Sequence, residues 1–144
     1  MTMDASGNLL IVDWNNHGVR KVGTDGNIKM LIGSGFLGDG SVNGSAANAV
    51  HLNHPSDITF DAEGNYWLTA WHNWKIKEFD ASSLTLFAKI GTSQGFSGNN
   101  GIGDTCKLNF PSSTVFDGNG NIYISDAGNQ QIRKDDTVQK LLQN

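Results

Sequence analysis

The side chains of this sequence that are best suited to chemistry are tryptophans, histidines, phenylalanines and one amide. They are Trp14, His17, Phe36, Trp71, His72, Trp74, Phe96 and Asn129. A flat aromatic ring covers a large area at a small entropic cost, and an amide can donate and accept hydrogen bonds, so this set suits recognition of a protein or a carbohydrate. We predict that these eight residues bind a ligand, and we predict no catalytic residue.

Other reactive groups do not form a recognisable metal or covalent-catalysis motif. The sequence has no Gly-x-Ser-x-Gly elbow and no phosphate loop, and its single cysteine, Cys106, can form neither an internal disulfide nor a thiolate zinc site. Asp39 and Asp104 lie in glycine-rich segments, but a Ca²⁺ site needs six or more oxygens. We therefore predict solvated turn carboxylates at these two positions, no metal and no cofactor.

A repeat positions these side chains. One motif ends in Gly-Asn and occurs three times, the second copy 57 residues after the first and the third 56 residues further, at 3–8, 60–65 and 116–121. A second motif begins five residues after each asparagine, at 13–20, 70–77 and 126–133. A fixed period of tens of residues is the signature of a repeat architecture, so the chain is built from three copies of one unit.

Each copy contains four short segments rich in β-branched and aromatic residues, bounded by glycine, asparagine and aspartate. In the middle copy they are 57–61, 65–70, 75–79 and 84–90. Four antiparallel strands followed by a long connection are the unit of a β-propeller blade. We predict an all-β chain with three four-stranded blades and two linkers, at about 1–33, 34–55, 56–91, 92–111 and 112–144.

The repeats resemble the NHL family, whose blades read roughly as proline, a strand, Asp-x-x-Gly-Asn, a strand and Asp-x-x-Asn-His-x-φ-Arg-Lys. The stretch from Asn16 to Lys21 is a close match, and the glycine- and alanine-rich linker is similar to that of many bacterial members. The other copies depart from the pattern, with Ala70 for the aspartate and Trp74 and Gln130 for the histidine. These departures argue against a role that needs one side chain in every blade.

NHL propellers commonly have six blades, so the resemblance implies that three blades form an incomplete ring. Open blade faces and strand edges favour aggregation unless something covers them. We predict completion either by a second copy, in a homodimer, or by further blades of a larger parent chain. The last strand of the third blade is predicted at 138–142.

In a propeller the linkers and the turns after the second strands share one face, and the predicted binding residues lie in these segments. A structural alternative stays open for several of them. Trp14, Trp71 and Trp74 could instead fill the gaps between blades, because large aromatic side chains are mostly buried. His17 could instead hold its turn by hydrogen bonds to the backbone.

The resemblance also implies an enzymatic alternative. Propellers similar to NHL blades include amidating lyases and gluconolactonase-like hydrolases, which hold a metal on the propeller axis. The candidate ligands are His51, His54 and Asp57, but the third copy has lysine, phenylalanine and serine at the equivalent positions. A ligand set would need two chains that pair their His54 side chains. We therefore predict a binding segment rather than an enzyme.

Charge and composition limit the possible partners. A net charge of −4 disfavours nucleic acid. A stripe of basic residues recurs at equivalent strand positions: Arg20-Lys21, Lys75, Lys77 and Arg133-Lys134. We expect the stems of these side chains to lie over apolar surface and their charged ends to be solvated. No apolar run approaches the ~20 residues of a membrane span. A possible glycosylation acceptor at 43–45 and the style of the linker favour an extracytoplasmic or cell-surface location.

Overall fold

The turn between the first two strands of each blade is built by one aspartate. In the first blade, Asp4 Oδ1 accepts hydrogen bonds from the backbone N–H groups of Ser6 and Asn8, at 3.0 and 2.9 Å. Gly7 takes a left-handed φ of 80°, which a residue without a Cβ adopts readily. Asp61 and Asp117 accept the equivalent backbone bonds in the other two copies. The Asp-x-x-Gly-Asn motif therefore encodes a hairpin turn.

A computed structural model describes residues 1–99 and 103–135, and in this part of the chain the strands form three antiparallel sheets, each referred to below as a blade. Blade 1 contains β1 (Thr2–Met3), β2 (Leu9–Asp13), β3 (Gly18–Val22) and β4 (Ile28–Ile32). Blade 2 contains β5 (Pro55–Phe60), β6 (Tyr66–Ala70), β7 (Lys75–Asp80) and β8 (Thr85–Ile90). Blade 3 contains β9 (Pro111–Phe116), β10 (Ile122–Asp126) and β11 (Gln131–Asp135). Within each blade, strands that follow one another in sequence are hydrogen-bonded neighbours.

Short 3₁₀ turns complete the described structure. The second and third strands of the blades are joined by η1 (Trp14–Asn16), η3 (Trp71–Asn73) and η5 (Ala127–Asn129). Two more turns, η2 (Ala47–Ala49) and η4 (Gly103–Thr105), lie in the first linker (33–54) and the second linker (91–110). Among the described residues no helix is long and apolar enough to cross a membrane.

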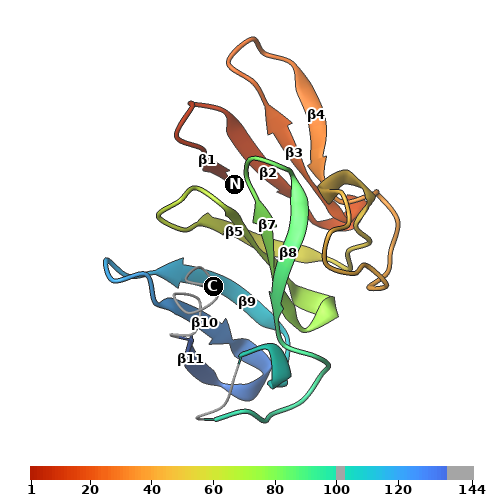
Figure 1. Ribbon diagram of the computed structural model, residues 1–144. Coiled ribbons are helices and arrows are strands. Elements are labelled where there is room, and N and C mark those ends of the chain that lie inside the picture. The colour runs from red at the N-terminus through yellow and green to blue at the C-terminus, as the bar shows by residue number, and fades with distance from the viewer. Residues whose placement is uncertain (100–102, 136–144) are drawn as a thin grey trace.

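The blades follow one another face to face, with blade 2 between the other two (Figure 1). One cluster of buried side chains joins blades 1 and 2 and includes Leu10, Leu68 and Phe79. A second cluster joins blades 2 and 3 and includes Trp67 and Ile124. All five residues of β6 are buried, because the strand packs on both sides. The middle blade therefore supplies a large part of both hydrophobic cores.

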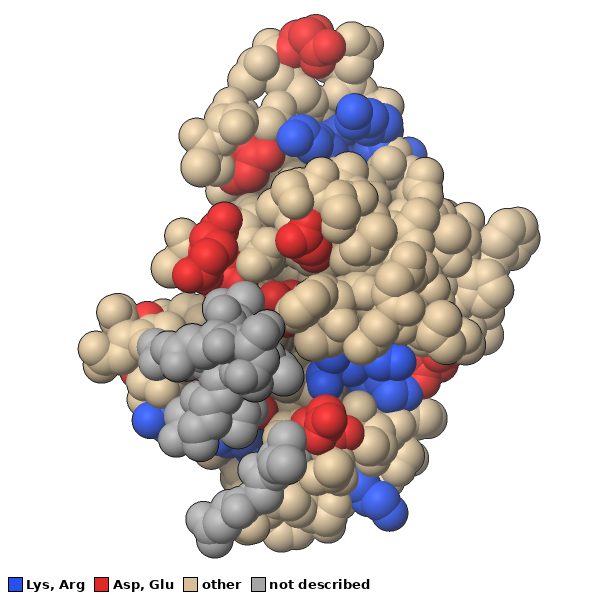
Figure 2. Space-filling model, in the orientation of Figure 1, with Lys and Arg blue, Asp and Glu red and all other residues tan. Residues whose placement is uncertain are grey.

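This architecture confirms the all-β propeller fold expected from the repeat. The strand expected at 138–142 lies outside the described residues. Acidic and basic side chains are interspersed on the face that Figure 2 shows, in keeping with the absence of a basic excess in the sequence. The basic stripe is not uniformly solvated, however, because the Lys77 side chain has an exposed fraction of 0%.

The buried amine of Lys77 departs from the expectation because a linker carboxylate reaches it. Lys77 Nζ lies 3.1 Å from Asp39 Oδ1 in the first linker, and Lys75 pairs with the other oxygen of the same carboxylate. Burial lowers the pKa of Lys77, and the charge of Asp39 opposes that effect. Asp39 is therefore an ion-pair partner rather than the solvated turn carboxylate that the sequence suggested.

Glu78 is a buried carboxyl group whose surroundings differ from those of the equivalent residue in blade 1. At the equivalent position of blade 1, Lys21 Nζ lies 3.2 Å from Asp4 Oδ2. Glu78 is only 3% exposed, and burial, followed by the charge of Asp61, raises its pKa to about 7. Blade 2 therefore sets two carboxylates near each other where blade 1 has a salt bridge.

Removing a buried ring should weaken the joint between blades 1 and 2. Phe79 is fully buried in the first cluster, so Phe79→Ala is expected to lower the free energy of unfolding by about 3–5 kcal/mol. Phe87→Ala is the matched control, because Phe87 is 46% exposed on β8, and its effect should stay within about 0.5 kcal/mol. Urea denaturation of the two variants measures the difference, and equal losses would contradict the assignment of the core.

Glu78 should make stability depend on pH near neutrality. Its pKa is about 7 in the folded chain, above the ordinary 4.5, so the favourable contribution of the proton is complete below pH 4.5 and is lost as pH rises through 7. Glu78→Gln should therefore stabilise the chain by about 3 kcal/mol at pH 8 and have little effect at pH 4. Urea titrations at both pH values test this, with the exposed Asp104→Asn, a carboxylate in the second linker, as control. A gain that is the same at both pH values would contradict it.

Candidate functional site

Six rings from the three repeats meet on one face of the molecule. They are Trp14, His17, His54, Trp71, His72 and Phe110, and we call them the ring face. The turns η1 and η3 supply the tryptophans with His72, His17 follows η1, and the linkers supply the other two rings. Each of these segments comes just before an innermost strand or just after a second strand. The topology therefore gathers rings that are up to 96 residues apart in sequence.

The rings touch one another in a continuous series. Trp14 lies 4.7 Å from Trp71, centroid to centroid, and Trp71 stacks on His72 at 4.0 Å with an interplanar angle of 16°. Phe110 lies 5.0 Å from Trp71, and His54 meets His72 edge to face at 4.9 Å. Aromatic pairs at these separations add about 0.5–1.5 kcal/mol beyond their buried area. The ring face is thus partly self-stabilised, while Trp14 keeps 40% of its surface exposed.

The hydrogen bonds define which nitrogen of each imidazole carries a proton. His17 Nδ1 accepts the backbone N–H of His54 at 3.3 Å, so the proton of neutral His17 is on Nε2. His54 Nδ1 lies 2.6 Å from Asn53 Oδ1, which can only accept, so His54 Nδ1 carries its proton. His72 Nδ1, 3.1 Å from His54 Nδ1, then accepts as well. The neutral face therefore has Nε2–H donors on His17 and His72 and an Nε2 acceptor on His54.

Burial and the nearby His54 disfavour the protonated forms of His17 and His72. Burial lowers the pKa of His17 and of His72, and the nearby His54 lowers both further. A second proton on His17 or His72 would also place an N–H against an existing donor. At neutral pH the ring face thus offers neutral donors, acceptors and aromatic surface.

The backbone of the ring face is in an unfavourable conformation at three of its residues. His17 and His54 both have a φ of 51°, in the left-handed region that costs a non-glycine residue about 1–2 kcal/mol. His54 also precedes Pro55, and the residue before a proline normally prefers extended backbone. Phe110, before Pro111, repeats this conformation with a φ of 48°. The surrounding contacts therefore hold the rings in place against a local preference.

A buried amide, Asn73, holds the first linker in position. Asn73 is 1% exposed, its Oδ1 accepts the backbone N–H of Asn53 at 2.9 Å, and its Nδ2 donates to the carbonyl oxygen of Gly38 at 2.8 Å. The backbone N–H of His72 donates to the carbonyl oxygen of Asn53 at 3.1 Å. Because Asn53 adjoins His54, these bonds position the His54 ring beside His72.

The eight binding residues predicted from the sequence do not lie at one place. Trp14, His17, Trp71 and His72 belong to the ring face. Trp74 has a left-handed backbone, and its indole Nε1 is buried without a hydrogen-bond partner among the described residues. Asn129 donates to the Gly95 carbonyl and to Asp126 inside the fold.

The two phenylalanines of the linkers differ from each other. Phe36 is 72% exposed, whereas Phe96 lies under the Arg133 guanidinium, 5.4 Å from ring centroid to Cζ. The ring face also includes His54 and Phe110, which the sequence analysis treated as equivalent positions for a metal ligand rather than as binding residues. Their shared place before a proline was the available signal.

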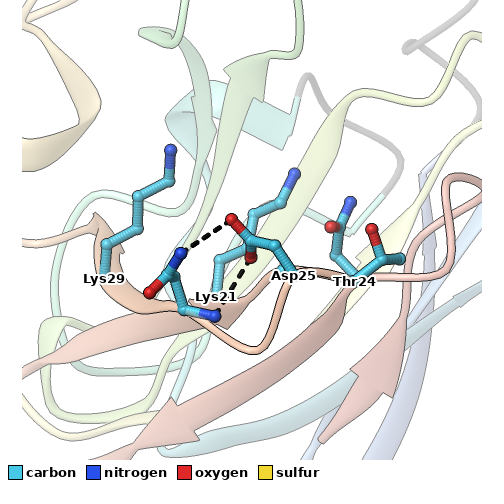
Figure 3. Close-up of a pocket in the computed structure, with 7 residues that line it drawn as sticks. Lys21, Thr24, Asp25 and Lys29 are labelled. Atoms are coloured by element: carbon cyan, nitrogen blue, oxygen red, sulfur yellow. Dashed lines mark hydrogen bonds between the residues drawn. The ribbon is translucent and has the colours of Figure 1, made fainter.

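A polar hollow on blade 1 is a second place where a ligand could be sought, and it lies between the turns of the first blade (Figure 3). The Lys21 and Lys29 side chains point in the same direction there, on neighbouring strands. Two of its three charged side chains are already engaged, because Lys21 pairs with Asp4 and the Asp25 carboxylate accepts both the backbone and the side-chain N–H of Asn27. The ring face is therefore the stronger candidate.

Comparison with known families identifies the repeat. Residues 108–134, from the end of the second linker through most of β11, match the model of the NHL repeat. The chain carries an NHL repeat. The equivalent stretch 52–78 shows the same turn, strand and linker geometry in blade 2. None of the curated proteins matches the chain in sequence.

Solved structures share the fold of this chain at low sequence identity. A protein of unknown function from Bacteroides thetaiotaomicron is 22% identical with a TM-score of 0.73, and the match covers 89% of this chain and 32% of that one. An auxiliary nutrient binding protein from the same organism is 17% identical with a TM-score of 0.65, and the match covers 88% of this chain and 34% of that one. Virginiamycin B lyase from Staphylococcus aureus is 14% identical with a TM-score of 0.56, and the match covers 92% of this chain and 39% of that one. The chain thus spans between about a third and two fifths of their length.

The lowered histidine pKa values predict acid sensitivity. His17 and His72 have pKa values below the ordinary 6.5 in the folded chain, so the unfolded chain binds more protons and the free energy of unfolding falls as pH drops below 6.5. His72→Gln should make this fall shallower between pH 6.5 and pH 5. The same substitution at an exposed histidine outside the ring face, His51→Gln, is the control. Parallel curves for the wild type and His72→Gln, measured by urea denaturation, would refute the prediction.

Proposed function

We propose that this NHL chain is a non-catalytic propeller segment whose ring face binds a protein or carbohydrate ligand. The observation that carries the proposal is the meeting of six aromatic and imidazole rings from all three repeats at one place. Rings of this kind are what binding surfaces use, because they combine a large apolar area with hydrogen bonds at the edge. The exposed part of Trp14 is the accessible entry to this surface.

The state of the imidazoles favours binding over acid–base catalysis. Nδ1 of each of the three histidines is already engaged in an internal hydrogen bond. The remaining Nε2 atoms have assigned roles as donors or as an acceptor, which suits the hydroxyl and amide groups of sugars and peptides. The similarity in fold to an auxiliary nutrient binding protein agrees with a binding role and adds no ligand identity.

A metal-dependent propeller enzyme, of the amidating-lyase or gluconolactonase type, is the alternative. The contact between His54 and His72 is the observation that favours it, together with the similarity in fold to virginiamycin B lyase. Against it, no group of three or more histidine, cysteine or carboxylate side chains has metal-binding geometry within residues 1–99 and 103–135. A ligand set built from this chain would need help from another blade or another copy.

The proposal includes completion of the propeller around the ring face. Blade 3 exposes Val115 and Ile132, by 59% and 72%, on the side away from blade 2. The residue of blade 2 equivalent to Ile132 is Ile76, which is fully buried against blade 3. A further blade, from a parent chain or from a second copy, would cover this surface in the same way. We place the assembled protein outside the cytoplasm, as the exposed acceptor Asn43 suggests.

Ligand binding should depend on the exposed tryptophan of the ring face. The full chain can be applied to a glycan array and a peptide array, and the strongest hit titrated by isothermal calorimetry. Trp14→Ala should weaken binding at least tenfold, because it removes the accessible ring. The similarly exposed Phe87→Ala should change affinity less than twofold.

Equal effects of the two substitutions, or no hit on either array, would refute the proposed site. Titration with Zn²⁺ distinguishes the metal-dependent enzyme from the proposed binding role. Tight binding that is lost in His54→Ala would favour the metal-dependent enzyme.

A further inference from the structure

In blade 3 a triad of polar side chains binds the second linker. The triad is Asp126, Asn129 and Arg133, at the end of β10, in η5 and in β11. Asp126 Oδ1 accepts the backbone N–H of Asn109 at 2.7 Å, and Asn129 Nδ2 donates to the carbonyl oxygen of Gly95 at 2.9 Å. Arg133 donates to the carbonyl oxygens of Ser97 and Lys107 at 2.8 and 3.2 Å. The linker backbone is thus fixed at four points.

Blade 2 binds the first linker at equivalent points with different side chains. Asn73 takes the place of the aspartate and accepts the N–H of Asn53, because residue 70 is alanine. Its Nδ2 donates to the Gly38 carbonyl, as Asn129 does to Gly95. Lys77 Nζ lies 3.4 Å from the carbonyl oxygen of His51. The same contact therefore occurs at both joints, even though the residues that make it differ.

Blade 1 carries the same triad, Asp13, Asn16 and Arg20, which we call the cradle. As in blade 3, where Asn129 and Arg133 also contact Asp126, the groups bond to one another: Asn16 Nδ2 donates to both oxygens of Asp13, at 2.9 and 3.0 Å, and Arg20 Nε donates to Asp13 Oδ2 at 2.8 Å. Within residues 1–99 and 103–135, however, no linker backbone bonds to these three side chains. The Asp13 and Arg20 side chains are 23% and 41% exposed. Their blade 3 counterparts, Asp126 and Arg133, are 0% and 11% exposed. The cradle therefore has the same three residue types as the blade 3 triad, but its side chains are more exposed to solvent.

The sheet face beside the cradle is also more exposed to solvent than the equivalent faces of the other blades. Met3 is 61% exposed, whereas its repeat equivalents Phe60 and Phe116 pack against the two buried clusters. Leu9 and Ile11 are half-buried, whereas their equivalents in blade 2, Tyr66 and Leu68, are buried against blade 1. Apolar and polar parts of a complete joint are therefore present together.

We propose that the cradle and this face bind a preceding NHL-type blade and the linker that leads out of it. The partner is defined by its chemistry. Its linker presents three backbone carbonyls to Asn16 and Arg20 and one backbone N–H to Asp13, and it ends in Leu-Asn-x-Pro. The leucine fills the joint, as Leu52 and Leu108 do at 0% and 1% exposure. The inference rests on the completion of the propeller proposed above, and its test uses no ligand, so the two can fail separately.

The test extends the full chain with a copy of its own linker. In the repeat register a second copy of residues 91–113, placed before Met1, positions its Asn109 to meet Asp13. We expect the extended chain to be at least tenfold more stable, as the ratio of folded to unfolded chain in urea, than a chain extended with the same residues in scrambled order. Asp13→Ala should remove this gain in the extended chain. In the unextended chain the same substitution should cost less, because it breaks only the contacts with Asn16 and Arg20.

A nuclear magnetic resonance measurement provides an independent readout. The side-chain N–H signals of Asn16 and Arg20 should shift in the extended chain and not in the scrambled one. Equal stability of the two extended chains, with no shift of these signals, would overturn the proposal. Sedimentation of the unextended chain tests the competing occupant, because a dimer in which the cradle signals already match the extended chain would show that a second copy fills the cradle without a preceding linker.

Discussion

The contact between each linker and the turn after the second strand of the next blade is the constraint on which the rest of the structure depends. It is made by buried side chains of that turn, Asn73 in blade 2 and Asp126 in blade 3, which hydrogen-bond to linker backbone. A linker packed between sheets must satisfy its N–H and carbonyl groups, since an unpaired buried group costs about 1–3 kcal/mol. The polar contact therefore accompanies the apolar clusters at each joint between blades.

The repeats keep this contact while exchanging the residues that make it. Where blade 3 has Asp126 opposite Arg133, blade 2 has Ala70, and the missing carboxylate is supplied from the linker by Asp39, which pairs with the buried Lys77. A buried amine without a partner would be costly, so loss of the strand carboxylate and gain of the linker carboxylate are physically coupled. Blade 2 departs again at Glu78, which lies where blade 1 has Lys21.

The ring face is a consequence of the same constraint. His54 and Phe110 both lie between the fixed asparagine of a linker and a proline, and both have left-handed backbone. The linker bonds offset this local cost and direct each ring toward the preceding turn, where Trp14 or Trp71 lies. The fold itself therefore holds the rings in place, and such an arrangement would reduce the entropic cost of the binding that we propose.

The sequence by itself determined the local elements. Asp-x-x-Gly-Asn closes a turn through bonds within five residues, so the strands expected at 75–79 and 84–90 agree with β7 and β8 to within a residue. The repeat in the sequence also predicts that Trp14, His17, Trp71 and His72 lie on one face, since repeat topology alone places their turns together. Only the tertiary structure decided that His54 and Phe110 join them, that Asn129 is a structural amide, and that Lys77 is buried. Each of these depends on partners more than about 15 residues away, and the free energy of such contacts is set by packing rather than by local preference.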